Sequence, residues 1–427
     1  MEYEITKAVL VSLCAENETM SDCEKSLDEL ERLLETAGGT CFAKLIQSKA
    51  KPDPRTLIGS GKVQELAALC RGNEIPIVVF DSELSPSQIR NLEDDIGGDV
   101  RVIDRSVLIL DIFALHAVTR EGKLQVELAQ LKYTAPRLTG QGKDLSRLGG
   151  GIGTRGPGES KLESDRRHMK HRIVALEEEL RVLEKNRKTM RAARDRSGLF
   201  KIAIVGYTNA GKSTLLNALT DAGVLAEDKL FATLDPTTRK MELPSGESLL
   251  LTDTVGLIRK LPHHLVKAFR STLDEAVYAD ALMIVIDAAD PEFREQLSVT
   301  EQLLDDLGAA GKPTIYVLNK CDLGAASAFP IGVPAEHAHT VAISAKTGQG
   351  LDRLSDLLEQ VLHEGKRRVT FQIPNSEGGA LNTLYRFGAV ESVDYGPDGM
   401  TVVATVDAKT YGMLRRFDPA YREEAED

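Results

Sequence analysis

A glycine-rich octapeptide with the chemistry of a phosphate-binding loop follows an apolar, strand-like run at residues 201–205. It reads G-x-x-x-x-G-K-S, and its residues are Gly206, Tyr207, Thr208, Asn209, Ala210, Gly211, Lys212 and Ser213. Residues 214–219 continue as an apolar helix candidate. In such a loop the backbone N–H groups surround phosphate oxygens, the lysine reaches the β- and γ-phosphates, and the hydroxyl binds Mg²⁺. The strand–loop–helix context predicts a nucleoside triphosphate site with Lys212 as a catalytic residue and Ser213 as a metal ligand.

A carboxylate for the same site is expected at the end of a second apolar strand. The tetrapeptide D-x-x-G, formed by Asp253, Thr254, Val255 and Gly256, follows the apolar residues 249–251. A carboxylate in this place lies beside the metal, which we expect Asp253 to hold through water. The N–H of Gly256 can face the γ-phosphate, which makes Gly256 a second catalytic candidate.

The residues that follow a third strand candidate predict which base the site binds. Asn319, Lys320, Cys321 and Asp322 follow the strand candidate 314–318. Guanine presents N1–H and N2–H₂ side by side to the carboxylate of Asp322, and adenine lacks that pair of donors. Ser344, Ala345 and Lys346 follow a further strand candidate, and we expect them over the guanine O6. These elements in this order predict a GTP site.

A threonine that senses the γ-phosphate must come from the loop between the first helix and Asp253. Residues 231–238 offer Thr233, Thr237 and Thr238, and spacing alone leaves all three as possible loop hydroxyls. Loops of this kind close around Mg²⁺ and the γ-phosphate and relax after hydrolysis.

Two residues depart from the simplest GTPase pattern. Leu257 stands where Ras-like enzymes carry a glutamine that orients water, so we expect slow intrinsic hydrolysis and acceleration by a partner. Asn209 offers a carbonyl oxygen to a monovalent cation such as K⁺, and an ordinary loop hydrogen bond is the equal alternative.

The elements that position these residues predict a multidomain α/β protein. Strand and helix candidates alternate over the first hundred residues, which indicates an α/β domain. The predicted parts are an N-terminal α/β domain (1–104), an antiparallel helical hairpin (105–197), a P-loop domain (198–365) and a small C-terminal α+β domain (366–427).

The predicted hairpin rests on two apolar stripes of helical spacing. The first contains Leu110, Phe113, Ala117, Leu124, Leu128 and Leu131, and the second runs from Leu162 to Met190. Between them, residues 140–158 contain eight glycines. A flexible linker is the plain alternative, but a basic glycine-rich tip also suits phosphate binding. Residues 137–196 hold 16 Lys and Arg against 9 Asp and Glu, within a chain of net charge −12. The RNA-binding candidates are Lys143, Arg147, Arg155, Lys161, Arg166 and Arg167.

Composition sets the broad class of the protein. The 427 residues are 42% hydrophobic and include five dispersed cysteines, a pattern that excludes a disulfide framework. The acidic start and the lack of a long apolar run predict a cytoplasmic protein without a membrane span. Nothing in the sequence requires more than a monomer.

These motifs together resemble the HflX family of translational GTPases. The resemblance rests on residues 206–213, the pentapeptide Phe231, Ala232, Thr233, Leu234 and Asp235, residues 253–256, 319–322 and 344–346, and the glycine-rich segment 147–160. It implies GTP and Mg²⁺ binding, with Ser213 and Thr233 as metal ligands and Thr233 as the third catalytic candidate. It also implies docking on ribosomal RNA of the large subunit and splitting of stalled or idle ribosomes, so that part of the protein is ribosome-bound.

Two other functions remain open at this stage. One is a regulatory GTPase whose hairpin holds a protein partner, and its basic residues are then a solvated face. The segment Gly59–Lys62 suggests an ATP-driven RNA remodeller, because the resemblance adds adenine-nucleotide activity in this region. However, Val63 stands where the metal-binding hydroxyl belongs, which favours a simple turn into a helix at 63–70.

Overall fold

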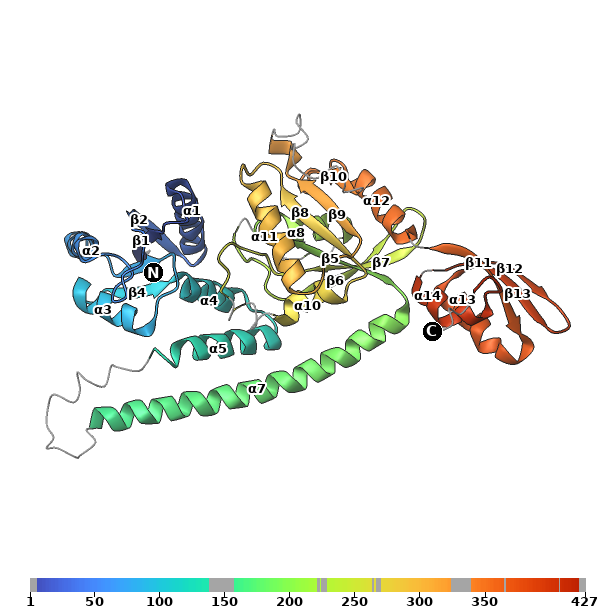
Figure 1. Cartoon of the computed structure of the whole chain (residues 1–427), viewed down its shortest axis with the longest axis horizontal. Coiled ribbons are helices and arrows are strands. Elements are labelled where there is room, and N and C mark those ends of the chain that lie inside the picture. Colours follow the sequence, from blue (N-terminus) through green and yellow to red (C-terminus); the bar gives the residue numbers. More distant parts are fainter. Residues whose placement is uncertain are drawn as a thin grey trace, which may run out of the picture.

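The computed structural model describes residues 6–137, 157–220, 223, 229–262, 265, 270–323, 339–364, 366–406 and 408–421. Three sheets follow one another along the chain, and a long helix runs beside the first two (Figure 1). The predicted multidomain α/β class is confirmed. Lys143, Arg147, Arg155 and the tail 422–427 lie outside the described residues, as does most of the glycine-rich tip.

The N-terminal sheet is parallel and covered on both faces. Its strands are β1 (Thr6–Cys14), β2 (Gly39–Ser48), β3 (Ile77–Phe80) and β4 (Arg101–Asp104), in the order β2-β1-β3-β4. Leu10 packs with α1 (Met20–Thr36), whereas Val9 and Val11 pack with α2 (Ser60–Gly72) and α3 (Pro86–Ile96). This alternation is what a strand buried on both faces requires. Helix α2 begins at Ser60, three residues before the start expected at Val63, so Ser60, Gly61 and Lys62 form its first turn rather than a loop before it.

The central sheet has six strands in the order β10-β9-β8-β5-β7-β6. They are β5 (Phe200–Gly206), β6 (Thr237–Glu242), β7 (Ser248–Asp253), β8 (Ala281–Asp287), β9 (Thr314–Asn319) and β10 (Thr340–Ala342). Only the β6–β7 pair is antiparallel. The helices that accompany this sheet in the same part of the chain are α8 (Lys212–Thr220), α10 (Arg270–Tyr278), α11 (Phe293–Asp306) and α12 (Leu351–His363). The carboxyl ends of β5, β7 and β9 bring three of the predicted motifs to one edge of the sheet.

The first arm of the hairpin corrects the sequence analysis. The apolar stripe from Leu110 to Leu131 suggests one helix, but the chain forms α4 (Arg105–His116) and α5 (Arg120–Thr134). Ala117 has an extended backbone with ψ 110°, and the Thr119 side chain accepts a hydrogen bond from Gly122 N. A helix therefore ends and a second, newly capped helix begins within three residues.

The second arm, α7 (Pro157–Ser197), pairs with α5 in antiparallel fashion (Figure 1). Leu176 is fully buried at this contact. Ion pairs join the two helices, namely Arg172–Glu127 at 2.7 Å, Lys132–Glu177 at 2.7 Å, Arg120–Glu179 at 3.0 Å and Arg187–Glu121. Residues 127 and 132 of α5 pair with residues 172 and 177 of α7, whereas residues 120 and 121 pair with residues 179 and 187. The start of α5 therefore lies beside the later part of α7, as antiparallel pairing requires.

The C-terminal sheet is antiparallel, with the order β11-β13-β12. Its strands are β11 (Arg367–Pro374), β12 (Ala389–Tyr395) and β13 (Gly399–Val406), and its helices are α13 (Gly378–Phe387) and α14 (Ala408–Leu414). Phe371, Leu384 and Val402 form its buried centre. No helix in the described part of the chain is long and apolar enough to cross a membrane.

Candidate nucleotide-binding site

A pocket lies where the loop after β5 meets the start of α8. Most of the predicted phosphate-side residues line it: Thr208, Asn209, Gly211, Lys212, Ser213, Phe231, Ala232, Thr233, Thr254 and Gly256. Lys229 and Thr214 complete the lining and are additions to the predicted set. The pocket thus collects parts of the chain that are separated by more than forty residues.

The loop after β5 is shaped by the absence of side chains at defined points. Gly211 has φ +93°, and a Cβ there would lie 2.3 Å from Asn319 Nδ2. Gly256 lies against the loop, since its own Cβ would be 2.7 Å from the Thr208 Cα. Leu257 then extends the contact, because Thr208 N donates to Leu257 O at 2.7 Å. The D-x-x-G segment is therefore seated on the phosphate-binding loop.

Lys212 is buried inside this loop. Its Nζ donates to Gly206 O at 3.1 Å and to Tyr207 O at 2.8 Å. Burial lowers the pKa of Lys212 to about 8, because the charged form loses its water. An anion at the pocket would favour the charged form and complete its hydrogen bonding.

Oxygen atoms from three separate segments converge beside Lys212. The Ser213 hydroxyl donates to Asp253 Oδ2 at 2.6 Å and lies 2.7 Å from the Thr233 hydroxyl. Asp253 is fully buried, and its Oδ1 has no hydrogen-bond partner among the residues that the structure describes. Burial raises the pKa of Asp253, so a cation there would stabilise its carboxylate. Hard oxygen ligands around an unpaired buried oxygen fit Mg²⁺.

The same cluster distinguishes the threonines of the loop. Thr233 points to Ser213, whereas Thr237 is the first residue of β6. The geometry therefore favours Thr233 as the third oxygen of the cluster.

The predicted base-reading residues also come together. Asn319 Nδ2 donates to Ala210 O at 2.9 Å, and Ala345 N donates to Asn319 Oδ1 at 2.9 Å. Lys320 pairs with Asp287 at 2.7 Å. The hydrogen bond from Ser344 lowers the pKa of the exposed Asp322, which therefore presents a carboxylate to solvent. Cys321 and Lys346 lie in the same two loops, and Cys321 N donates to Ile343 O.

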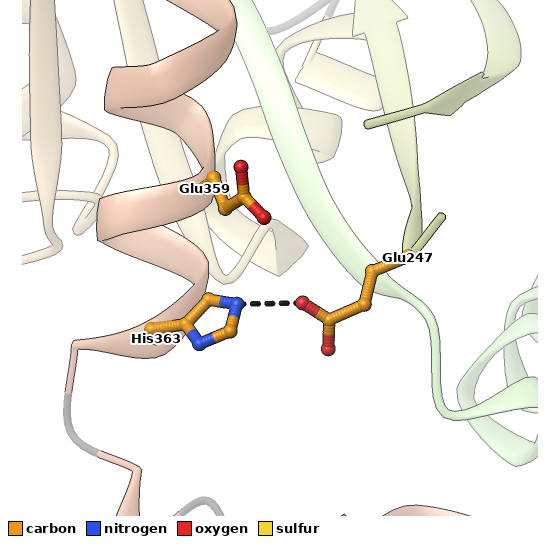
Figure 2. A group of neighbouring side chains, drawn as sticks. All are labelled: Glu247, Glu359 and His363. Carbon is orange, nitrogen blue, oxygen red and sulfur yellow. Dashed lines mark hydrogen bonds and ion pairs between the residues drawn. The ribbon is translucent and has the colours of Figure 1, made fainter. Parts of the chain in front are cut away.

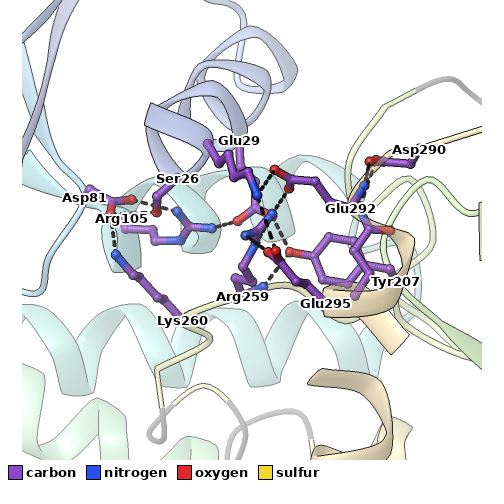
Figure 3. A network of polar contacts seen from close by, with 12 residues as sticks. Ser26, Glu29, Asp81, Arg105, Tyr207, Arg259, Lys260, Asp290, Glu292 and Glu295 are labelled. Atoms are coloured by element: carbon purple, nitrogen blue, oxygen red, sulfur yellow. Dashed lines mark hydrogen bonds and ion pairs between the residues drawn. The ribbon is translucent and has the colours of Figure 1, made fainter. Parts of the chain in front are cut away.

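Tyr207 is the functional position whose side chain the sequence analysis missed. Its backbone belongs to the phosphate-binding loop, but its hydroxyl donates to Glu29 Oε2 of α1 and accepts from Arg259 N at 2.8 Å (Figure 3). The ring is 6% exposed, and burial raises the pKa of Tyr207, which keeps the hydroxyl protonated. The loop is thereby tied to the N-terminal sheet and to the segment after Gly256.

A buried ionic network continues from this hydroxyl (Figure 3). Arg105 is 2% exposed and binds Glu29 and Asp81, the latter at 2.8 Å. Burial lowers the pKa of Arg105 to about 10, which still leaves it charged at neutral pH. Lys260 reaches Asp81 at 2.9 Å, and Arg259 binds Glu292 and Glu295 of the α11 region. Arg259 and Lys260, the third and fourth residues after the D-x-x-G segment, thus connect the N-terminal and central parts of the chain.

The loop that carries Thr233 has a second set of contacts with the N-terminal half. Asp235 Oδ2 accepts from Val118 N at 3.0 Å and from Thr119 N at 2.8 Å. The rings of Phe231 and Phe113 meet edge to face at 4.8 Å, and Leu234 is buried in the same core. Of the predicted pentapeptide, Thr233 faces the pocket while Leu234 and Asp235 face the helices.

A separate polar cluster lies far from this pocket, between the β6–β7 turn and the end of α12 (Figure 2). His363 Nε2 lies 2.6 Å from Glu247 Oε2, and Lys366 Nζ lies 3.1 Å from the other oxygen of Glu247. Glu359 completes the group. An ammonium already occupies Glu247, so we interpret the cluster as ion pairing that fixes α12 to the hairpin turn.

Three family models match the chain, in the order of its parts. They are described as GTP-binding GTPase N-terminal (residues 24–114), GTP-binding GTPase Middle Region (116–194) and 50S ribosome-binding GTPase (201–320). The chain is 48% identical to GTPase HflX of Lacrimispora saccharolytica, over 98% of this chain and 97% of that protein. It is 42% identical to GTPase HflX of Escherichia coli, over 92% and 91% of the two chains. The crystal structure of a GTP-binding protein from Sulfolobus solfataricus in complex with GDP is 27% identical, covers 84% of this chain and 98% of that one, and has a TM-score of 0.44.

Proposed function

Since this chain belongs to the HflX family of GTPases, we propose that it associates with the large ribosomal subunit and splits or rescues stalled or idle ribosomes. The chain is a GTP-binding GTPase with a P-loop domain. The proposal goes beyond membership of this GTPase family in three respects. These are the association with the ribosome, the roles of individual residues, and a cytoplasmic location in which part of the protein is ribosome-bound.

We assign a role to each group around the phosphates as part of this proposal. Lys212 neutralises the β- and γ-phosphates, and the Gly256 N–H donates to the γ-phosphate. Ser213 and Thr233 hold Mg²⁺ directly and Asp253 through water, because these oxygens converge and Asp253 Oδ1 has no partner among the described residues. Bound Mg²⁺ supplies positive charge against the β- and γ-phosphate oxygens. Asp322 reads the guanine edge, and Asn319 holds the two neighbouring loops in place.

Leu257 supports slow hydrolysis without a partner. Its side chain is 3% exposed and lies in the apolar core with Phe113 and Phe231. It therefore points away from the pocket, and it carries no group that holds water. Acceleration by a ribosomal partner fits this arrangement.

The distribution of basic residues along α7 carries the ribosome proposal. Near its middle, Arg172 pairs with Glu127 and Arg187 with Glu121. Toward the tip, Arg166, Arg167 and Lys170 are exposed and form no ion pair with another described residue. The N-terminal end of α7 lies away from the central sheet (Figure 1). Exposed cations at this end of the helix suit a polyanion such as ribosomal RNA.

The test is GTP hydrolysis with and without large ribosomal subunits at several salt concentrations. We expect strong stimulation that falls with salt, because each phosphate contact releases bound counterions. Replacing Arg166 and Arg167 by Glu should weaken subunit binding and reduce the salt slope by about 1.5, at roughly 0.7–0.9 for each lost contact. Arg353→Glu reverses a charge on α12 and serves as the matched control.

Each alternative function has its own outcome in these assays. A protein partner on the hairpin predicts binding with weak salt dependence and no stimulation by the ribosomal subunit. An ATP-driven remodeller predicts ATP turnover that survives Lys212→Ala. An unchanged salt slope after reversal of Arg166 and Arg167 would refute the role of the hairpin tip.

We extend the proposal to K⁺ as a further cofactor. Asn209 lines the phosphate pocket with φ +62°, and its carbonyl oxygen is a suitable ligand. Hydrolysis measured in K⁺ and in Na⁺ tests this point, and equal rates would remove K⁺ from the site.

A further inference from the structure

The break between α4 and α5 is also the place where the nucleotide site touches the hairpin. We call residues 116–122 the α4–α5 corner and residues 231–235 the switch segment. The switch segment lies about 115 residues further along the chain than the corner, yet it supplies the carboxylate that binds the corner's backbone. A feature that periodicity could not predict therefore coincides with an interdomain contact.

The polar half of this contact is made by Asp235. One carboxylate oxygen accepts from Val118 N at 3.0 Å and from Thr119 N at 2.8 Å, and the other accepts from the Thr119 hydroxyl. Hydrogen bonds to an ionised acceptor are stronger than neutral ones. The carboxylate also lies at the N-terminus of α5, where the helix dipole favours negative charge.

The apolar half is made by Phe231. Its ring is 2% exposed and contacts Phe113 of α4 edge to face at 4.8 Å. Phe231 N also donates to Thr208 Oγ1 of the phosphate-binding loop at 2.8 Å. The switch segment is thus anchored at both ends, and between the anchors Thr233 lies 2.7 Å from Ser213.

The corner does not need Asp235 for its own folding. The Thr119 hydroxyl already caps α5 by accepting from Gly122 N at 2.9 Å. Val118 and Thr119 are exposed, so water can satisfy their N–H groups when the carboxylate leaves. The N-terminal cap of α5 is therefore complete without Asp235. The carboxylate can dock and leave while α5 stays folded, as a reversible contact requires.

We propose that Asp235 and Phe231 are positioning residues that hold Thr233 at the metal site by docking on the α4–α5 corner. Closure of the switch segment around GTP and fixation of α5 are then one event, and α5 passes the nucleotide state to α7 through their ion pairs. The proposal rests on the proposed role of Thr233 as a metal ligand.

Gly122 allows a test that removes no hydrogen-bonding group. A Cβ at Gly122 would lie 2.5 Å from Asp235 Oδ1, so Gly122→Ala should expel the carboxylate. Alanine is also a better helix former than glycine, so the variant keeps or strengthens α5. Gly61→Ala is the matched control, because Gly61 also lies in the first turn of a helix and a Cβ there meets nothing within 4 Å.

The measurement is the affinity of each variant for GDP and for a non-hydrolysable GTP analogue in Mg²⁺. We expect Gly122→Ala to weaken binding of the GTP analogue about tenfold, since charge-assisted hydrogen bonds are lost and water replaces them only partly. GDP binding should change less than twofold. The analogue should also slow amide exchange at residues 118–122 in the unaltered chain and in Gly61→Ala, but not in Gly122→Ala.

Further variants separate the proposal from its premise. Asp235→Ala should behave like Gly122→Ala, and the double variant should be no weaker than either one, because both remove the same contact. Suppose that Thr233→Ala abolishes the preference for the GTP analogue over GDP while Gly122→Ala keeps it. The positioning role of Asp235 and Phe231 is then refuted, and the metal-ligand role of Thr233 stands. If Thr233→Ala keeps the preference, the metal-ligand role fails, and the positioning role fails with it.

Discussion

Replacing Tyr207 by phenylalanine should loosen the N-terminal sheet from the central one without altering the phosphate-binding backbone. The hydroxyl is the only atom lost, and it joins Glu29 Oε2 to Arg259 N. The ring itself stays, so no cavity forms in the core. The change therefore isolates two hydrogen bonds.

The expected loss of stability follows from the groups that lose a hydrogen-bond partner. Glu29 is 9% exposed, and its Oε2 would keep only Arg259 Nε, at 3.8 Å. A bond to a charged group contributes about 1.5–3 kcal/mol and a neutral one about 0.5–1.5 kcal/mol, which gives about 2–4 kcal/mol together. Loss of about 2 kcal/mol lowers the melting temperature of a unit of 150–250 residues by roughly 4–8 °C.

The assay combines a thermal melt with amide exchange in α1 and α4. Tyr207→Phe should melt earlier and exchange faster at the network, with GDP affinity nearly unchanged because Lys212 still donates to the Tyr207 carbonyl. Tyr395→Phe, on a ring that is 73% exposed, is the matched control. A melting temperature and exchange pattern equal to those of the control would refute the buried network.

Three further outcomes test other parts of the structure. Asp322→Asn should weaken GTP about 10–100-fold, the loss expected for a bidentate base contact, and should improve binding of xanthosine triphosphate, whose 2-oxo group accepts from an amide; nucleotide titrations measure both. Partial burial raises the pKa of Cys41 to about 11, so at pH 8 its thiolate fraction should be about a hundredfold below that of free cysteine and its alkylation slower, and labelling as rapid as that of free cysteine would contradict the raised pKa. Leu176→Ala should destabilise the α5–α7 contact by about 2–5 kcal/mol, seen as faster proteolysis of the hairpin with unchanged GDP binding.

The phosphate-side residues were predictable because their chemistry is local. Gly206–Ser213 and Asp253–Gly256 each lie in one short segment between recognisable elements, and residues from both segments line one pocket. The C-terminal strands and helices also follow from alternation and spacing over short windows. In these parts of the chain, neighbours in the sequence determine the structure.

The helix break at Ala117–Thr119 was not predictable in this way. Apolar spacing continues through Ala117, and the carboxylate that occupies the break comes from Asp235. Tyr207 and Arg105 are similar cases, because their shared partner Glu29 lies 178 and 76 residues away along the chain. A charged residue beside the apolar run 107–110 is the one local hint that Arg105 is buried against a partner.

The helix α7 gives the molecule a mechanical property that follows from its length. At 1.5 Å per residue its 41 residues span about 60 Å, and its last residue precedes Gly198 and the strand of the phosphate-binding loop. Gly198 has φ +71°, and a Cβ there would lie 2.6 Å from the ring of Phe387, the last residue of α13. Gly198 is thus a pivot point at one end of the long helix α7. A rotation of about 5° at Gly198 displaces the first residue of α7 by about 5 Å, so a small change near the phosphate-binding loop becomes a larger displacement at the start of this helix.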